Sequence, residues 1–205
     1  MEETFKNKDI NWTKNLNPFQ ILIGAVLSTR TKDINTEKAT KLLFQTYSSP
    51  KSLAKAPLSK VKKLIRSAGF YKTKAKQIKE ISKILLNKYN EKIPKSREEL
   101  EKLPGVGKKV SAIVLSFAFN SLDVIPVDVH VFRIANRIGL VKTKTPEETE
   151  KELLKIVPKE FRRDFNKLFV LFGQNICSKN PKCKICPIRT KCTYFKKIYK
   201  LNFRK

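Results

Sequence analysis

Apolar positions along this 205-residue chain recur every three to four residues, which is the spacing of one face of an α-helix. No pair of alternating apolar and polar runs is joined by a short turn, so no β-hairpin is predicted. The pattern therefore predicts an all-α protein of about ten helices. The helices expected from the apolar runs and their caps cover the approximate ranges 18–29, 33–47, 58–67, 73–89, 96–102, 107–119, 129–138, a helix from 146, and 158–176.

Capping residues support several of these boundaries. Asn17 followed by Pro18 is an N-cap with proline at the first helical position. Asp33 or Asn35 is expected to cap the second helix, and Asp128 the helix at 129–138.

Two segments differ from the rest of the chain. The helix at 107–119 is the most apolar, and we expect it at the centre of the fold. The segment 177–205 contains all four cysteines and is expected to form loops.

The charge indicates the class of partner. The chain has 45 Lys and Arg against 18 Asp and Glu, a formal net charge of +27, which predicts binding to a polyanion such as DNA, RNA or an anionic membrane. Base composition of the genome is the alternative source of part of this lysine excess. No run approaches the roughly 20 apolar residues of a membrane span. No helix alternates basic and aromatic residues along one membrane-facing stripe, so a membrane is the least favoured partner. The acidic start Met1-Glu2-Glu3 has no apolar region behind it, so we expect no secretion signal and a cytoplasmic protein.

A turn with two glycines, Leu103-Pro104-Gly105-Val106-Gly107, lies between the helices at 96–102 and 107–119. Glycines at this spacing allow a tight turn that points backbone N–H groups outward. The turn leads into a helix N-terminus, where free N–H groups and the helix dipole favour an anion, and Lys108 and Lys109 follow directly. The segment predicts a site that binds a DNA phosphate without reading the base sequence. An ordinary corner between two helices is the alternative.

Lys109 and Asp128 are the candidate catalytic residues. The helix dipole, the adjacent Lys108 and burial on an apolar helix would favour the neutral amine of Lys109, which is a nucleophile. A carboxylate at Asp128 could stabilise a cationic intermediate or accept a proton. A solvated lysine and a simple N-cap are the alternatives. The single histidine, His130, is expected to pack and hydrogen-bond rather than to catalyse.

The cysteines predict a metal site. The pattern C-x5-C-x2-C-x5-C is formed by Cys177, Cys183, Cys186 and Cys192. Structural zinc and a 4Fe–4S cluster are both compatible with four cysteines, and two disulfides are a weaker alternative. One central C-x2-C flanked by two longer gaps favours the cluster, because structural zinc sites usually show two separate C-x2-4-C pairs.

These features together resemble the endonuclease III family of helix–hairpin–helix DNA glycosylases, over nearly the whole span from Pro18 to Cys192. The similar segments are Leu103-Pro104-Gly105-Val106-Gly107-Lys108-Lys109, Val127-Asp128-Val129-His130-Val131-Phe132-Arg133, Val26-Leu27-Ser28-Thr29-Arg30-Thr31-Lys32-Asp33 and Gly69-Phe70-Tyr71-Lys72-Thr73-Lys74-Ala75. The resemblance implies a six-helix barrel domain at 17–122 containing the helix–hairpin–helix. It also implies a cluster domain at 1–16 and 123–205, with DNA in the cleft between the two. The chain departs from the family pattern by a first cysteine gap of five rather than six residues, and by Arg30 and Phe70 in place of a Gln and a smaller apolar residue.

The function implied by this resemblance is base excision repair. The enzyme would be a DNA glycosylase with AP lyase activity, acting on damaged bases, especially oxidised pyrimidines, or abasic sites in double-stranded DNA. Lys109 would form a Schiff base that permits β-elimination, and Asp128 would stabilise the cationic sugar. Arg30 and Phe70 would fill the space left by the extruded nucleotide.

The resemblance also implies the remaining contacts. Further DNA contacts are expected from Tyr71, Gly105, Val106, Gly107, Lys108 and His130. The carbonyls of Glu101, Leu103 and Val106 could bind a monovalent cation, the cluster would be structural, and the protein would be a monomer.

Two other functions stay open from the sequence. One is a monofunctional mismatch or adenine glycosylase of the same fold. The adenine branch is disfavoured because the helix at 18–29 contains no carboxylate and because Lys109 occupies the Schiff-base position. The other is a non-enzymatic DNA-binding module held together by a metal.

Overall fold

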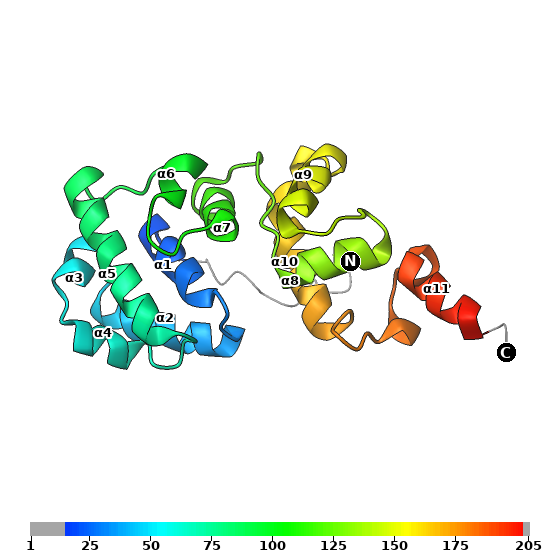
Figure 1. Ribbon diagram of the computed structural model, residues 1–205, viewed down its shortest axis with the longest axis horizontal. Coiled ribbons are helices and arrows are strands. Elements are labelled where there is room, and N and C mark those ends of the chain that lie inside the picture. The colour runs from blue at the N-terminus through cyan, green and yellow to red at the C-terminus, as the bar shows by residue number, and fades with distance from the viewer. Residues whose placement is uncertain (1–14, 203–205) are drawn as a thin grey trace. The chain divides into compact units, whose positions relative to one another are not determined.

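The computed structural model describes residues 15–202 of the chain, and in that range it contains α-helices and short 3-10 helices but no strand (Figure 1). Residues 1–14 and 203–205 lie outside the described part, including the acidic start and most of the 1–16 segment expected in the cluster domain. The chain divides into two compact units, and among the described residues it passes from one unit to the other between Asn120 and Ser121. None of the described helices is both long and apolar enough to cross a membrane.

In its described part, from residue 15 to Asn120, the first unit contains seven α-helices. They are α1 (Pro18–Ser28), α2 (Asp33–Thr46), α3 (Pro50–Lys55), α4 (Leu58–Leu64), α5 (Tyr71–Lys88), α6 (Arg97–Glu101) and α7 (Lys108–Phe119).

The core of this unit is formed around α1 and α7. In α1 every residue from Ile21 to Leu27 is buried, and α7 is buried continuously from Val110 to Ser116. The two helices pack against each other, and α1 also packs on α2 and α5 (Figure 1). Asn17 fixes the start of α1 with a capping box, since its side chain accepts a hydrogen bond from the backbone of Gln20. The expectation that the helix at 107–119 is central is confirmed, and α1 shares that position.

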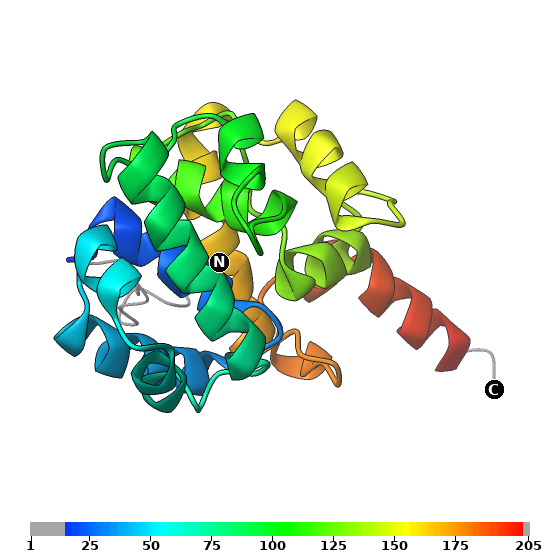
Figure 2. The ribbon, with the colours of Figure 1, turned by 60° about the vertical axis from the view of Figure 1, so that its left-hand side comes forward.

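Between Ser121 and Asn202 the second unit contains four α-helices and two 3-10 helices. They are α8 (Val129–Ile138), α9 (Pro146–Ile156), α10 (Lys159–Asn175), η2 (Cys183–Ile185), η3 (Arg189–Lys191) and α11 (Thr193–Asn202). In Figure 2 the orange segment with the cysteines connects α10 to the red helix α11, which packs on α8.

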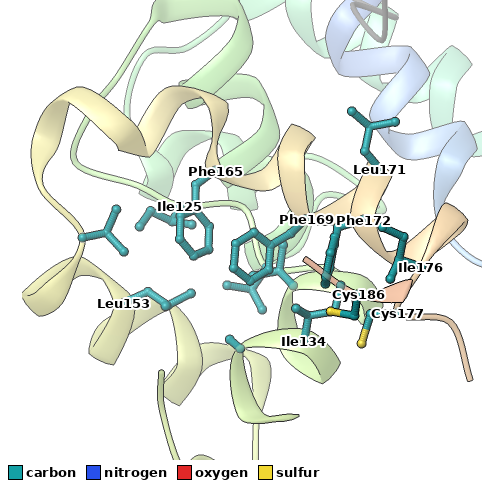
Figure 3. Packing of buried hydrophobic residues seen from close by; sticks show 14 residues of the cluster. Ile125, Ile134, Leu153, Phe165, Phe169, Leu171, Phe172, Ile176, Cys177 and Cys186 are labelled. Atoms are coloured by element: carbon teal, nitrogen blue, oxygen red, sulfur yellow. The ribbon is translucent and has the colours of Figure 1, made fainter. Parts of the chain in front are cut away.

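Aromatic side chains of α10 dominate the core of the second unit (Figure 3). The rings of Phe165 and Phe169 stack with their centroids 4.1 Å apart, and Phe172 is fully buried. Cys177 and Cys186 belong to the same buried cluster. The cysteine segment is therefore attached to a packed apolar core.

Three local predictions were wrong. The apolar pattern missed α3, although Ser49 followed by Pro50 is a helix start and the Ser49 side chain accepts from the backbone of Ser52. The segment after Cys192 forms α11 instead of a loop. Asp33 is the first residue of α2, not its cap; it still lies where a carboxylate favours the helix dipole.

Candidate active site and metal centre

The turn between α6 and α7 depends on one of its two glycines for its conformation. Gly105 has a φ of +79°, and a Cβ there would lie 2.7 Å from the Gln77 side chain on α5. Val106 is buried and its N–H donates to the carbonyl of Leu103 at 3.1 Å. Gly107 has a φ of −105°, which any residue can adopt, and a Cβ there would meet nothing within 4 Å. Gly107 therefore contributes open space in front of α7, and the left-handed conformation of the turn depends on Gly105 alone.

The N-terminus of α7 combines amide groups with two lysines. Gly107 is its N-cap and has no side chain to accept from the first-turn N–H groups, so these face outward. Lys108 is exposed, whereas Lys109 is half-buried at the edge of the apolar part of the helix. The end of α7 thus has the electrostatics of an anion site with an accessible amine beside it.

The two segments expected to probe DNA lie against each other. Arg30 and Phe70 are both exposed, and both have left-handed backbone conformations, with φ of 49° and 56°. The Arg30 guanidinium lies 5.9 Å from the centroid of the Phe70 ring, within cation–π range. A Cβ at Gly69 would lie 2.5 Å from the carbonyl oxygen of Arg30, so only glycine fits there. Tyr71 follows as the first residue of α5 and is half-buried.

Lys74 lies beneath these segments and is only 3% exposed. Its Nζ donates to the carbonyls of Leu27 and Thr29 at 2.8 and 2.5 Å and to the Thr31 hydroxyl at 2.8 Å. Burial, and then the charge of Lys109, lowers the pKa of Lys74 to about 8. Lys74 therefore connects the Arg30 segment electrostatically to the start of α7.

Asp128 caps α8. Its Oδ1 accepts from the backbone N–H groups of His130 and Val131 at 2.8 and 2.9 Å. No contact with the described residues engages Oδ2, and the side chain is half-buried. One carboxylate oxygen is thus held by the helix and the other is available to a substrate.

His130 packs tightly inside the second unit. A Cβ at Gly173 of α10 would lie 2.2 Å from its Nδ1, and Nδ1 is 3.1 Å from Nη2 of Arg133. Arg133 also donates through Nε and Nη2 to the carbonyl of Cys177. The packing and hydrogen-bonding role expected for His130 is confirmed, and its contact with DNA stays a prediction.

The four cysteines line one pocket between α8, the end of α10 and the start of α11. All four are free, and Cys177, Cys186 and Cys192 are buried. Burial, and then the three neighbouring sulfurs, raises the pKa of the Cys183 thiol, so the four sulfurs are close enough to interact. Within the described residues no group of three or more His, Cys, Asp or Glu side chains is set to hold a metal ion.

Polar groups around this pocket point at the sulfurs. Nη1 of Arg137 lies 3.8 Å from Sγ of Cys177, and the backbone N–H of Phe195 donates to Sγ of Cys192 at 3.5 Å. Arg137 also donates to the carbonyls of Ser178 and Lys179. These donors match the hydrogen bonding that tunes thiolate ligands in metal centres.

Known proteins are similar to this chain in sequence and in fold. The profile of the HhH-GPD superfamily of base excision DNA repair proteins matches residues 23–159. Endonuclease III of Thermotoga maritima is 47% identical over 185 residues, which cover 90% of this chain and 86% of the relative. The chain belongs to the endonuclease III family. A trapped endonuclease III–DNA covalent intermediate has a similar structure, with a TM-score of 0.87 and 36% identity over 97% of this chain and 93% of the other. A thermostable thymine-DNA glycosylase has a TM-score of 0.83 and 28% identity, over 95% and 91% of the two chains.

Membership in the endonuclease III family confirms the function class and the fold expected from the motifs. The protein is an all-α base excision repair enzyme of the DNA glycosylase and AP lyase class.

Several residues at this site were not singled out by sequence reasoning. Lys74 and Gln77 occur three residues apart on α5, so they share one face, which contacts the Arg30 segment and the hairpin. Arg133 and Arg137 occur four residues apart on α8 and both reach the cysteine segment. Helical spacing was the available signal, but the contacts of these side chains are formed with distant parts of the chain.

Proposed function

We propose that this enzyme removes damaged pyrimidines, especially oxidised ones, from duplex DNA and cleaves the strand through a Schiff base on Lys109. The position of Lys109 carries this proposal: it is a half-buried amine in the first turn of α7, directly after the hairpin, in a chain of the endonuclease III family. A cation-rich helix N-terminus beside DNA phosphate is where such an amine would meet the sugar.

The chemistry follows from an amine at this point. The Nζ lone pair attacks C1′, the C1′–N bond breaks, and the base leaves with the bonding electrons and takes up a proton. The ring oxygen then leaves C1′, giving an iminium ion. Loss of a proton from C2′ expels the 3′ phosphate, and water releases the sugar fragment and restores the amine.

Asp128 is assigned the electrostatic role. Its Oδ1 is occupied by two backbone N–H groups of α8, so Oδ2 would face the sugar as positive charge develops there. It would also accept the proton that the attacking amine loses.

The DNA contacts are assigned to three groups of residues. Phosphate would be bound by the backbone N–H groups of Gly105 and Gly107 and by Lys108, together with a monovalent cation on the carbonyls of Glu101, Leu103 and Val106. The N–H of Val106 holds the turn itself, since it donates to the carbonyl of Leu103. The exposed Arg30 and Phe70, with Tyr71 beside them, would enter the duplex where the damaged nucleotide leaves it. His130 would contact the DNA backbone through the exposed side of its ring.

The cysteines are assigned to a 4Fe–4S cluster. Four thiols that line one pocket, hydrogen bonds directed at the sulfurs, and one central C-x2-C flanked by two five-residue gaps support a cluster over a single zinc ion. When bound, the cluster supplies a covalent cross-link between the end of α10 and the segment before α11. Cys177, Cys183, Cys186 and Cys192 would be its ligands.

Borohydride trapping on abasic duplex DNA tests the proposal. Wild-type protein should form a covalent adduct, and Lys109→Gln should form none, because only an amine can make the reducible Schiff base. Lys108→Gln is the matched control: it removes the neighbouring exposed lysine, so it should weaken DNA binding but still form the adduct when the DNA concentration is high enough to saturate the protein. An adduct with Lys109→Gln would refute the assignment of the nucleophile, and no adduct with the wild-type protein would refute the lyase reaction.

A panel of lesion duplexes tests the substrate class. Excision of oxidised pyrimidines, with no excision of undamaged adenine opposite a lesion, would separate this enzyme from a monofunctional adenine glycosylase. Trapping of the wild-type protein would by itself exclude a non-enzymatic DNA-binding module. We further expect a cytoplasmic monomer, since one chain supplies every residue assigned above and its substrate is chromosomal DNA.

A further inference from the structure

The buried ammonium of Lys74 is surrounded by acceptors from the chain that leads into and out of Arg30. The carbonyls of Leu27 and Thr29 and the hydroxyl of Thr31 lie within 2.8 Å of Nζ. An ammonium has three N–H donors, and here each has one acceptor. The three contacts bracket Arg30 on both sides, so they fix its backbone.

The Thr31 hydroxyl also ties this segment to the one that carries Phe70. It accepts from the backbone N–H of Gly69 at 3.1 Å, while the carbonyl of Arg30 fills the space where Gly69 lacks a side chain. Phe70 follows directly and serves as the N-cap of α5, the same helix that carries Lys74 one turn later.

Two exposed residues with left-handed backbone conformations therefore lie side by side. Arg30 and Phe70 each have a positive φ, a conformation that persists in non-glycine residues only when the surroundings hold it. Phe70 is 65% exposed, so its own side chain contributes little of that restraint. The restraint comes from beneath, from Lys74, Thr31 and Gly69.

We propose that Lys74 is a positioning residue for base extrusion, which holds Arg30 and Phe70 as one rigid unit that enters the duplex. The inference rests on the proposed function, because it assumes that these two residues occupy the space of the displaced nucleotide. At neutral pH the lysine is charged, since its pKa is about 8, and it therefore keeps all three donors.

The same helix provides a matched control. Lys79, five residues further along α5, donates to the carbonyls of Ala54 and Ala56 at the end of α3. Lys74 and Lys79 therefore make the same kind of contact, a lysine that binds carbonyls at a helix end. Lys79 makes it away from Arg30 and Phe70.

The test compares Lys74→Met with Lys79→Met. Single-turnover excision of thymine glycol from a duplex requires extrusion, whereas β-elimination at an abasic site in a single strand does not. Lys74→Met should slow the duplex reaction by about tenfold or more, because misplacing a positioning group by about 1 Å can cost a hundredfold, and should change the single-strand reaction by less than about twofold. Lys79→Met should leave both reactions near the wild-type rate.

A fluorescence signal reports extrusion directly. 2-Aminopurine beside the lesion brightens when it unstacks, and the measurement is made in the Lys109→Gln background, where no bond to the sugar forms. The increase should persist with Lys79→Met and be lost with Lys74→Met. Thr31→Val removes the hydroxyl and keeps the side-chain shape, and it should also reduce the fluorescence increase. This variant replaces Lys74→Met in the test if Lys74→Met folds poorly.

The outcomes separate the two proposals. Equal losses on duplex and single-strand substrates with Lys74→Met, or a full fluorescence signal with both Lys74→Met and Thr31→Val, would overturn the positioning role. Failure of wild-type protein to trap abasic DNA would instead overturn the proposed function.

Discussion

Replacing Asp128 by Asn separates its role in catalysis from its role as a helix cap. Oδ1 accepts two backbone hydrogen bonds at the start of α8, and an Asn side chain has a carbonyl oxygen at the same position. Since Asn and Asp cap helices about equally well, only the charge interaction with the helix dipole is lost, about 0.3–1 kcal/mol. Asp128→Ala removes the cap itself and should cost about 0.5–2 kcal/mol.

The two variants should differ in thermal stability but lose about the same excision rate. For a chain of this size, about 1 kcal/mol corresponds to a Tm change of roughly 2–4 °C, so Asp128→Ala should lower Tm clearly more than Asp128→Asn. Both variants lack the carboxylate that we propose faces the sugar cation, and both should lose about a hundredfold to a thousandfold in excision rate, equivalent to about 2.7–4 kcal/mol.

The assay is single-turnover excision from a lesion duplex, measured well below each Tm, beside thermal unfolding monitored by circular dichroism. Near-wild-type excision by Asp128→Asn would refute the catalytic role and leave Asp128 as a cap. A rate loss that follows the loss of Tm across the two variants would have the same meaning.

Three further predictions concern electrostatics, backbone and metal. Lys109→Gln should raise the pKa of Lys74 from about 8 towards 10.5, because it removes a neighbouring positive charge; the rate of amine acetylation against pH, read by mass spectrometry, measures this. Between those two values the unfolded chain binds more protons, so the unfolding free energy should rise with pH, by at most about 1.4 kcal/mol per pH unit, and Lys74→Met should abolish that rise. Gly105→Ala should destabilise the fold by about 1–2 kcal/mol, because alanine is strained at a positive φ. Gly107→Ala should keep the unfolding free energy within about 0.5 kcal/mol of wild type but weaken DNA binding at all sequences. Denaturant unfolding measures the first effect and DNA titration the second. Purified protein should be yellow-brown and contain about four iron atoms per chain, and stoichiometric zinc without iron in elemental analysis would exclude the cluster.

Local chemistry along the chain determined most of the helices and several of their ends. Asn17 and Asp128 both cap the helices that they were expected to cap, because an N-cap bonds to N–H groups two or three residues away and needs no distant partner. The spacing of the four cysteines and the hairpin before Lys109 are local in the same way. These motifs were enough to indicate the family and its chemistry.

Tertiary packing decided what local pattern could not. α3 is only six residues long and is held by packing on α5, so the pattern of apolar positions gave no signal for it. α11 packs on α8, and its residues Tyr194, Phe195 and Ile198 do lie at helical spacing, a signal that was overlooked beside the cysteine motif.

The distinction is clearest among the lysines. In a chain with 45 cationic side chains, nothing local marks Lys74 as different from its neighbour Lys72 or from Lys76. Lys74 is buried because the end of α1 presents carbonyl oxygens to it, and those acceptors come from residues more than 40 positions earlier in the chain. The sequence by itself determined where the helices cap and which residues carry chemistry, whereas only the tertiary structure decided which charged groups lose their water, since desolvation depends on every element packed around them.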